Sequence, residues 1–169
     1  TNDIRLYHIA KAYVKYQTKL KENNALDFDD IIFLTVKLLQ ENEDVRTYYQ
    51  RKFRYVLVDE YQDSNGVQDA IFTALSRERN NCFLVGDVKQ SIYQFRLADP
   101  GIFLKKYHDY VSANHAVAGE GRKILLSHNF RSGMEVIDGV NAVFRNCMRP
   151  KVGGLHYGEE EALREGVPH

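Results

Sequence analysis

Cysteine is scarce in this chain of 169 residues, which contains only Cys82 and Cys147. Neither belongs to a Cys-x-x-Cys pair, so the sequence excludes a disulfide framework and favours a reducing, cytoplasmic environment. An excess of charge of one sign is also lacking, because 23 Lys and Arg balance 23 Asp and Glu. A general electrostatic attraction to nucleic acid is therefore not indicated, although a local basic groove is compatible with this balance.

Long hydrophobic runs are missing too. No apolar stretch approaches the roughly 20 residues that a membrane helix needs, and no secretory hydrophobic region opens the chain. We therefore expect no membrane partner. The 44% of hydrophobic residues is ordinary for a globular protein. The chain begins at Thr1 rather than Met, so we expect an excised piece of a longer protein.

Several segments have the apolar spacing of helices. Asp27 is the expected N-cap of the second of these helices. The buried stripe of that helix is expected to consist of Phe28, Ile31, Ile32, Thr35, Leu38 and Leu39. The helical segments are 2–22, 27–41, a short one at 44–52, and then 66–76, 100–111 and 133–145.

Three short apolar runs lie between these later helices, at 55–58, 82–85 and 124–126. Strands that are apolar on both faces are typical of a parallel sheet covered by helices. The alternation therefore predicts an α/β fold, a parallel sheet flanked by helices. The polar segment 112–122 is expected to be an exposed loop or a joint between two lobes, and 153–169 a tail. In such sheets, ligands bind beyond the carboxyl ends of the strands.

Two adjacent carboxylates, Asp59 and Glu60, follow the first predicted strand. An apolar strand that runs into such a pair is typical of nucleoside triphosphatases. Asp59 would then hold Mg²⁺ through water, and Glu60 would orient and deprotonate the attacking water. A solvated turn would explain the dipeptide alone, but it explains poorly the longer string that includes Gln62 and Asp63.

The second strand runs into Gly86 and Asp87, where the glycine allows a close backbone approach. Gln90 is placed to reach a terminal phosphate. Nearby residues form an aromatic and cationic cluster on which bases of single-stranded DNA could stack, at roughly 1–3 kcal/mol each. This cluster consists of Tyr93, Phe95 and Arg96. The alternative is that the two rings are ordinary core aromatics.

Arg131 follows the third predicted strand and lies just before a helix. Its guanidinium would suit a developing phosphoryl charge. A surface arginine near a helix N-terminus is the alternative, although the helix dipole makes that position slightly unfavourable for a cation.

Taken together, four strings resemble the superfamily-1 DNA helicases of the UvrD/Rep type. They are DFDD at 27–30, VDEYQD at 58–63, VGDVKQSIY at 85–93 and NFRS at 129–132. The longer stretch 86–100 and the segment 152–157 are similar to the AddA component of the bacterial AddAB helicase/nucleases, which are relatives of RecB.

The resemblance implies a role for each matched residue. Asp59 would coordinate Mg²⁺ and Glu60 would be the general base of ATP hydrolysis. Gln90 would sense the γ-phosphate and couple it to DNA, while Asp87 shapes the turn. The remaining implied roles are single-strand DNA contacts for Tyr93, Phe95 and Arg96, packing against adenine for Phe130, and an arginine finger for Arg131. The family often has Trp where this chain has Phe95.

The chain also departs from the family, because no Gly-x-x-x-x-Gly-Lys-Ser/Thr phosphate loop occurs in it. We therefore expect a partial RecA-like motor, a P-loop NTPase domain without its phosphate loop, that is inactive by itself. The expected parts are a helical segment from an inserted subdomain (1–24), the later first motor lobe (25–118), a strand–helix unit at the junction with the second lobe (119–150) and a truncated continuation (151–169).

The resemblance implies a bacterial, cytoplasmic parent protein that uses ATP and Mg²⁺. It would be a 3′-to-5′ DNA helicase that processes double-strand breaks with a second helicase/nuclease subunit, and it would act on single- and double-stranded DNA.

Two alternatives remain open. A non-enzymatic single-strand DNA-binding or interaction module derived from a helicase would keep the aromatic cluster but would not need Glu60 or Gln90. A stand-alone metal-dependent phosphohydrolase could use Asp59, Glu60, Asp63 and Asp87. The six histidines show no recognised ligand spacing that would support it.

Overall fold

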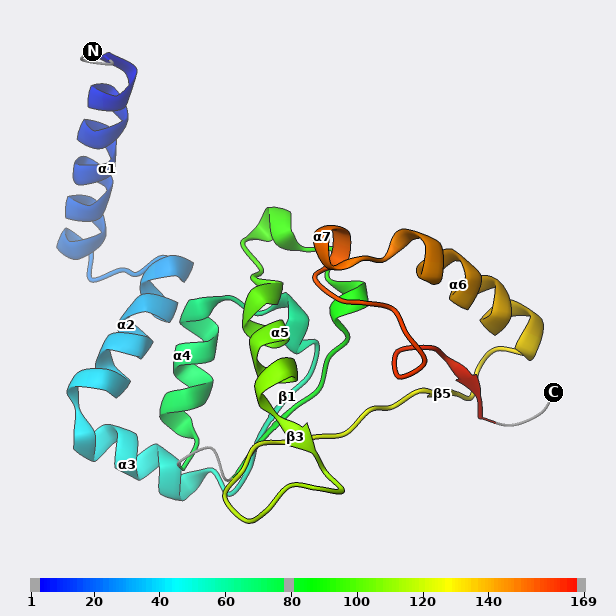
Figure 1. Cartoon of the computed structure of the whole chain (residues 1–169). Helices are drawn as coiled ribbons and strands as arrows, with labels where there is room; N and C mark the ends of the chain where they lie inside the picture. The colour runs from blue at the N-terminus through cyan, green and yellow to red at the C-terminus, as the bar shows by residue number, and fades with distance from the viewer. Residues whose placement is uncertain (1–3, 78–80, 167–169) are drawn as a thin grey trace. The chain divides into compact units, whose positions relative to one another are not determined.

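The computed structural model describes residues 4–77 and 81–166 (Figure 1). The chain divides into two compact units. Unit 1 consists of Thr1–Arg54 and Val67–Leu75, and unit 2 of Tyr55–Gly66 and Ser76–His169. Among the described residues, no helix has both the length and the apolar character needed to cross a membrane.

Unit 1 is helical, with α1 (Ile4–Glu22), α2 (Phe28–Glu41), α3 (Glu43–Lys52) and most of α4 (Gly66–Leu75). These helices confirm the predicted segments to within one or two residues at the described ends. The predicted N-cap is confirmed as well. Asp27 Oδ1 accepts a hydrogen bond from Asp30 N at 2.8 Å, and Asp30 Oδ2 accepts one from Asp27 N at 3.3 Å. This reciprocal capping box satisfies two amides that the first turn leaves without helical partners.

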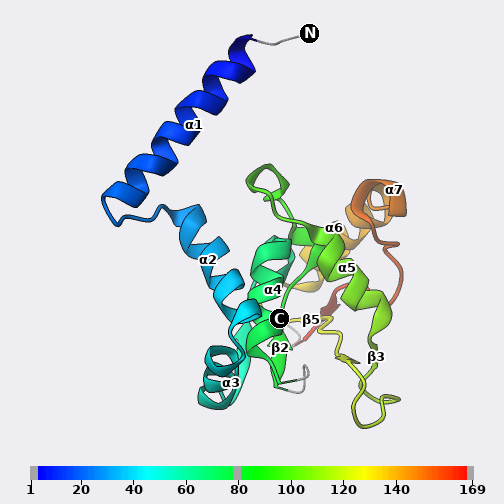
Figure 2. The same cartoon turned by 90° about the vertical axis from the view of Figure 1, so that its left-hand side faces the viewer.

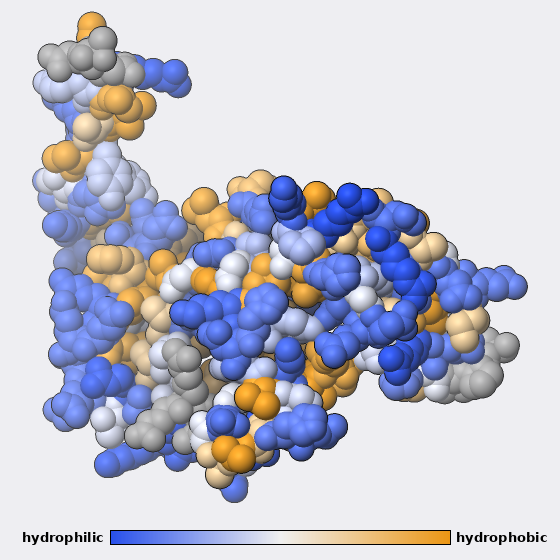
Figure 3. Space-filling model, in the orientation of Figure 1, coloured by the Kyte–Doolittle hydropathy of each residue, from blue (hydrophilic) through white to orange (hydrophobic). Residues whose placement is uncertain are grey.

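The buried stripe predicted for α2 is wrong. Of its six residues only Leu39 is buried, at 3% exposure, while Phe28 is 86% exposed. Within unit 1, α2 packs against α3 near its C-terminal end, where Arg46 donates to Leu39 O at 3.0 Å. None of the residues of α1 is buried, and the helix extends away from the other helices of unit 1 (Figure 2). Its exposed apolar side chains lie among polar ones (Figure 3).

Unit 2 begins with a parallel strand pair, β1 (Val56–Val58) and β2 (Cys82–Leu84), in which Leu57 lies opposite Phe83. The α/β class with parallel strands is therefore confirmed. The expectation that both faces are covered is not, because Leu57 is 73% and Phe83 55% exposed. Val56 and Val58, which point to the opposite face, are half-buried.

The prediction of a third strand at 124–126 is wrong. Residues 124–126 form no strand, and Leu126 is 83% exposed. Short strands lie on either side of this run. β3 (Val111–Ser112) pairs with β4 (Arg122–Lys123), and β5 (His128–Asn129) pairs with β6 (Arg164–Glu165), both in parallel. The described residues thus form three separate two-stranded pairs rather than one sheet. The expected loop between 112 and 122 connects β3 to β4.

The other described elements of unit 2 are helices. Short 3-10 helices follow β1 and β2, and they are η1 (Tyr61–Asp63), η2 (Val88–Gln90) and η3 (Gln94–Arg96). α5 (Pro100–Asp109) packs against η1 and η2. α6 (Met134–Cys147) and α7 (Pro150–Gly153) lead into the last segment.

That last segment, which the sequence suggested to be a tail, is packed over its described part. Leu155, Tyr157 and Ala162 are at most 5% exposed, and β6 lies beside β5 (Figure 1).

Candidate functional site

The acidic pair lies directly after β1, and both carboxylates are exposed. Glu60 adopts a left-handed backbone conformation, with φ 51° and ψ 38°. Such a conformation is unfavourable for a residue with a side chain, so it persists only where neighbouring contacts hold it. Here Glu60 N donates to Asp59 Oδ1 at 2.9 Å, and Gln62 Nε2 donates to Glu60 Oε2 at 2.7 Å. The local fold therefore fixes the Glu60 carboxylate.

Gln62 joins the ends of β1 and β2. Its side chain is 1% exposed, and its Oε1 accepts a hydrogen bond from Asp87 N at 2.9 Å. The backbone brings the two ends together as well, because Tyr61 N donates to Val85 O at 2.8 Å. Gly86 makes room for this arrangement, since a Cβ there would lie 2.5 Å from Gln62 Oε1. Sequence reasoning gave Gln62 no role of its own. The available signal was an amide side chain next to the acidic pair and a glycine at the end of the neighbouring strand.

Asp87 organises the loop after β2, as predicted. Its Oδ1 accepts a hydrogen bond from Lys89 N at 3.0 Å and caps η2. Its Oδ2 accepts one from Gln90 Nε2 at 3.1 Å, while Gln90 itself is exposed. A continuous set of hydrogen bonds thus runs from Glu60 through Gln62 and Asp87 to Gln90. The structure therefore brings two of the predicted catalytic residues to one edge of the β1–β2 pair.

Lys89 lies between two carboxylates. Its Nζ is 2.8 Å from Asp87 Oδ1 and 3.4 Å from Glu161 Oε2. Burial by itself would lower the pKa of the Lys89 ammonium. The hydrogen bond and charge of Asp87, with those of Glu161, outweigh burial, and the pKa is raised. On the other side, the Tyr107 hydroxyl donates to Glu161 Oε1. Burial and this contact raise the pKa of Tyr107.

The aromatic cluster is exposed beside this loop. The Tyr93 and Phe95 rings lie 5.9 Å apart, and the Arg96 guanidinium is 5.3 and 5.5 Å from their centroids. Tyr93 is 38% and Phe95 75% exposed, so the interpretation of the two rings as core aromatics is wrong. A cation over exposed rings offers both a face for stacking and a positive charge.

The third predicted strand end is arranged differently. Asn129 Oδ1 accepts hydrogen bonds from Arg131 N and Ser132 N, both at 2.9 Å, in a tight turn before α6. Phe130 is 64% exposed and its ring lies against Gly166. Over residues 4–77 and 81–166, no hydrogen bond or ion pair joins Phe130 or Arg131 directly to Glu60 or Gln90. The structure therefore brings the first two ends together but not the third, because β5 pairs with β6 and not with β1 or β2.

Asp59 is the residue that would hold Mg²⁺ at this edge. Asp59 presents one exposed carboxylate at the end of β1, which suits an ion that keeps several waters and takes one or two carboxylates. In the described part of the chain, no group of three or more His, Cys, Asp or Glu side chains is placed to hold a metal ion.

Comparisons with known proteins agree with the helicase motifs. Residues 1–111 match the UvrD/REP helicase N-terminal domain. The AddA protein of Clostridium beijerinckii, an ATP-dependent helicase/nuclease subunit, is 45% identical over 164 residues, which is 90% of this chain and 13% of that protein. Proteins with the same name from Streptococcus agalactiae and Lactococcus lactis are 45% identical over 152 residues and 40% identical over 158 residues. The chain spans only 12–13% of the length of these relatives. Its match over residues 1–111 shows that the chain belongs to the UvrD/REP helicase family.

Proposed function

We propose that this chain is part of the motor of an ATP-dependent DNA helicase/nuclease, which couples ATP hydrolysis to 3′-to-5′ movement along single-stranded DNA. The observation that carries the proposal is the hydrogen-bonded series from Glu60 to Gln90 at the ends of β1 and β2. It joins a candidate general base to a candidate phosphate sensor. We further propose that the partner is a second helicase/nuclease subunit, that the task is double-strand-break processing, and that the location is the bacterial cytoplasm.

In this proposal, Glu60 orients and deprotonates the attacking water. Gln62 Nε2 donates a hydrogen bond to Glu60 Oε2 at 2.7 Å, which leaves the other oxygen of Glu60 available to accept the proton. Asp59 would hold Mg²⁺, which when bound would supply positive charge against the phosphates. Gln90 lies on the same edge, where its side-chain amide could contact a terminal phosphate if its bond to Asp87 opens. Phe130 would pack against adenine and Arg131 would stabilise the developing phosphoryl charge.

The DNA strand would lie over the cluster of Tyr93, Phe95 and Arg96. This cluster follows Gln90 by only a few residues, so a change at the phosphate sensor has a short path to the DNA-binding surface. The 169 residues alone are expected to be inactive, because no phosphate-loop sequence occurs within them. In this proposal, residues 1–24 belong to an inserted helical subdomain and residues 25–118 to the first motor lobe. Residues 119–150 form the junction with the second lobe, and 151–169 continue into it.

The test is Glu60→Gln in the longer protein. We expect DNA-stimulated ATP hydrolysis to fall about 10²- to 10⁴-fold, the usual contribution of a general base. DNA binding should persist, because the substitution leaves the aromatic cluster intact. Glu135→Gln, which makes the same change at an exposed position of α6, should hydrolyse ATP normally. Unchanged turnover in Glu60→Gln would refute the proposed role.

The exposed aromatic cluster also favours a second candidate, a DNA-binding module without catalysis. Both candidates predict weaker single-strand binding in Tyr93→Ala and Phe95→Ala, about 5- to 150-fold each for the loss of one stacking contact. Only the motor predicts the loss of hydrolysis in Glu60→Gln. The two measurements together therefore distinguish the candidates.

A further inference from the structure

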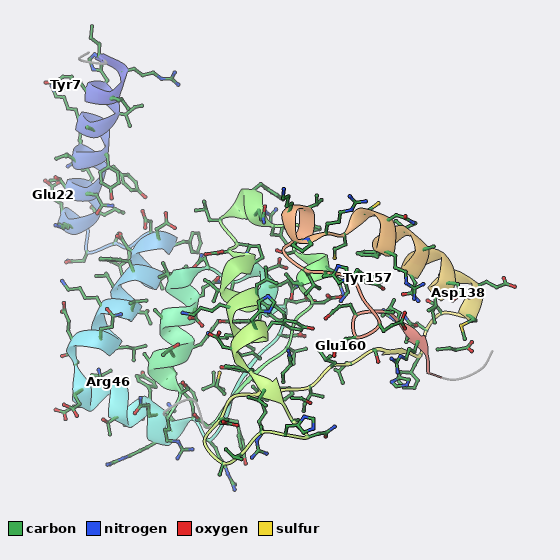
Figure 4. The ribbon with its side chains drawn as sticks, viewed as in Figure 1. Tyr7, Glu22, Arg46, Asp138, Tyr157 and Glu160 are labelled. Atoms are coloured by element: carbon green, nitrogen blue, oxygen red, sulfur yellow. The ribbon has the colours of Figure 1, made fainter. Side chains whose placement is uncertain are left out.

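One carboxylate outside the proposed ATP and DNA site has an unexpected environment. Glu161 lies on the segment between α7 and β6, next to the exposed Glu160 (Figure 4). The side chain of Glu161 is only 9% exposed, while that of Glu159 in the same acidic run is 83% exposed. A carboxylate is rarely buried to this degree without partners. Its two oxygens are therefore expected to be held, and both are.

The two oxygens of Glu161 bind different elements. Oε2 lies 3.4 Å from Lys89 Nζ in η2, and Oε1 accepts a hydrogen bond from the Tyr107 hydroxyl in α5. The side chain of Lys89 is itself only 16% exposed. A largely buried ammonium between two carboxylates is stabilised in its charged form, in agreement with its raised pKa. Removing one partner would leave the other buried charge poorly compensated.

The contact leads to the proposed phosphate sensor in three steps. Glu161 holds Lys89, Lys89 Nζ is 2.8 Å from Asp87 Oδ1, and Asp87 Oδ2 accepts the side-chain amide of Gln90 at 3.1 Å. The same Asp87 carboxylate thus serves both Lys89 and Gln90. A shift of Lys89 would move the acceptor that fixes Gln90.

Glu161 is also connected to the other end of the site. It lies three residues before Arg164, where β6 begins, and β6 pairs with β5. Asn129, the last residue of β5, forms the turn that carries Phe130 and Arg131. Residues 158–166 therefore contact both the loop after β2 and β5, the strand that precedes Arg131. Among the described residues, no direct hydrogen bond joins Phe130 or Arg131 to Gln90.

We propose that Glu161 is a positioning residue for Gln90, which it holds through Lys89 and Asp87, and that it ties the β5–β6 pair with Phe130 and Arg131 to the loop after β2. This inference rests on the proposed function, since it assigns Glu161 to the coupling of ATP and DNA binding. Glu161 touches neither ligand in this proposal. It acts by fixing the side chain that does.

The test measures coupling rather than activity alone. In the longer protein, the Kd for a labelled oligo-dT strand is measured with and without a non-hydrolysable ATP analogue, together with kcat and KM for ATP. The ratio of the two Kd values reports the coupling free energy at equilibrium. Glu161→Gln should move this ratio at least about fivefold toward one and lower kcat about tenfold, with KM for ATP little changed. Gln90→Ala should abolish the coupling, so that the ratio of the two Kd values becomes one.

Two further variants separate positioning from folding. The double variant Glu161→Gln with Gln90→Ala should be no worse than Gln90→Ala alone, because both changes break one series of contacts. Tyr107→Phe removes one hydroxyl that holds Glu161 and should shift the ratio in the same direction by less. It carries the test if Glu161→Gln fails to fold. Glu159→Gln is the matched control, and its ratio should equal that of the unchanged protein.

The outcomes are distinguishable. The inference is overturned if Glu161→Gln folds and leaves the ratio unchanged while Gln90→Ala brings the ratio to one. The proposed function stays intact in that case. A purely structural role is indicated if Glu161→Gln lowers the melting temperature but not the ratio, and this too overturns the inference. Unchanged hydrolysis in Glu60→Gln overturns the proposed function itself, and the inference with it.

Discussion

Asn141 on α6 offers a sharp test of how the C-terminal segment is held. The residue is 5% exposed, and its amide makes three hydrogen bonds to the segment between α7 and β6. Oδ1 accepts hydrogen bonds from the Tyr157 hydroxyl at 2.7 Å and from Leu163 N at 3.0 Å, while Nδ2 donates one to Leu163 O at 2.9 Å. Leu163 follows the Glu161 contact and directly precedes β6, so Asn141 holds the segment on which the further inference depends.

Asn141→Ala removes all three bonds and leaves both backbone groups of Leu163 without these partners. At about 1 kcal/mol net for each bond, the loss is about 3 kcal/mol. Alanine is the better helix former by about 0.5 kcal/mol, so the expected net loss is about 2–3 kcal/mol. For a chain of 150–250 residues, 1 kcal/mol corresponds to roughly 2–4 °C in Tm, so a fall of roughly 5–10 °C is expected.

The measurement is thermal unfolding, with hydrogen exchange at the Leu163 and Arg164 amides as a local probe. Asn146→Ala is the matched control, because Asn146 lies on the same helix but is exposed and donates only to Ala142 O. Its stability should stay within about 0.5 kcal/mol of the unchanged protein. Equal Tm values for the two variants, with Leu163 still protected, would show that the amide network does not hold this segment.

Two further predictions concern the strand ends and the start of α2. Gly86→Ala places a Cβ 2.5 Å from Gln62 Oε1, so we expect a loss of about 1–3 kcal/mol in denaturant unfolding. Gly133→Ala, where nothing lies near the added carbon, is the control, and equal losses would contradict the crowding argument. At Asp27, the hydrogen bond from Asp30 N and that from Tyr16 lower the pKa. A lowered pKa stabilises the folded state above the unfolded value of about 3.9 and loses that effect as pH falls through the folded value. Helicity by circular dichroism should therefore fall below about pH 4 in the unchanged chain. Asp27→Asn should remove this step, and an unaltered pH profile would refute the assignment.

The helices could be predicted because their signals are local. Asp27 caps α2 through an amide three residues away, and the apolar spacing from Ile4 to Glu22 needs only the helix itself. The pairing of β1 with β2 was predictable for a related reason. Two short apolar runs separated by a helix favour parallel strands, and their polar ends then meet at one edge. The neighbourhood of Glu60 and Gln90 follows from that topology.

Burial could not be predicted in the same way, because an apolar face indicates a partner without identifying it. Phe28 and Ile31 were expected to be buried but are 86% and 50% exposed. The run at 124–126 has the composition of a strand, yet the strands form on either side of it, where hydrogen-bonding partners are available. Asn141 and Glu161 were missed for another reason. Their roles depend on contacts to residues 16 to 72 positions away, which no local pattern reveals.

The apolar face of the β1–β2 pair and the polar edge at its end differ in what holds them in place. The apolar face of β1 and β2 around Leu57 and Phe83 is uncovered in the part of the chain that the structure describes, so no packing contact there fixes it. The polar edge is held by contacts within unit 2, because Gln62, which is 1% exposed, forms hydrogen bonds with Glu60 and with Asp87 N. Hydrogen bonds to a buried amide are geometrically strict, whereas apolar burial tolerates many partners. The relative positions of Glu60 and Gln90 can therefore be set within this unit.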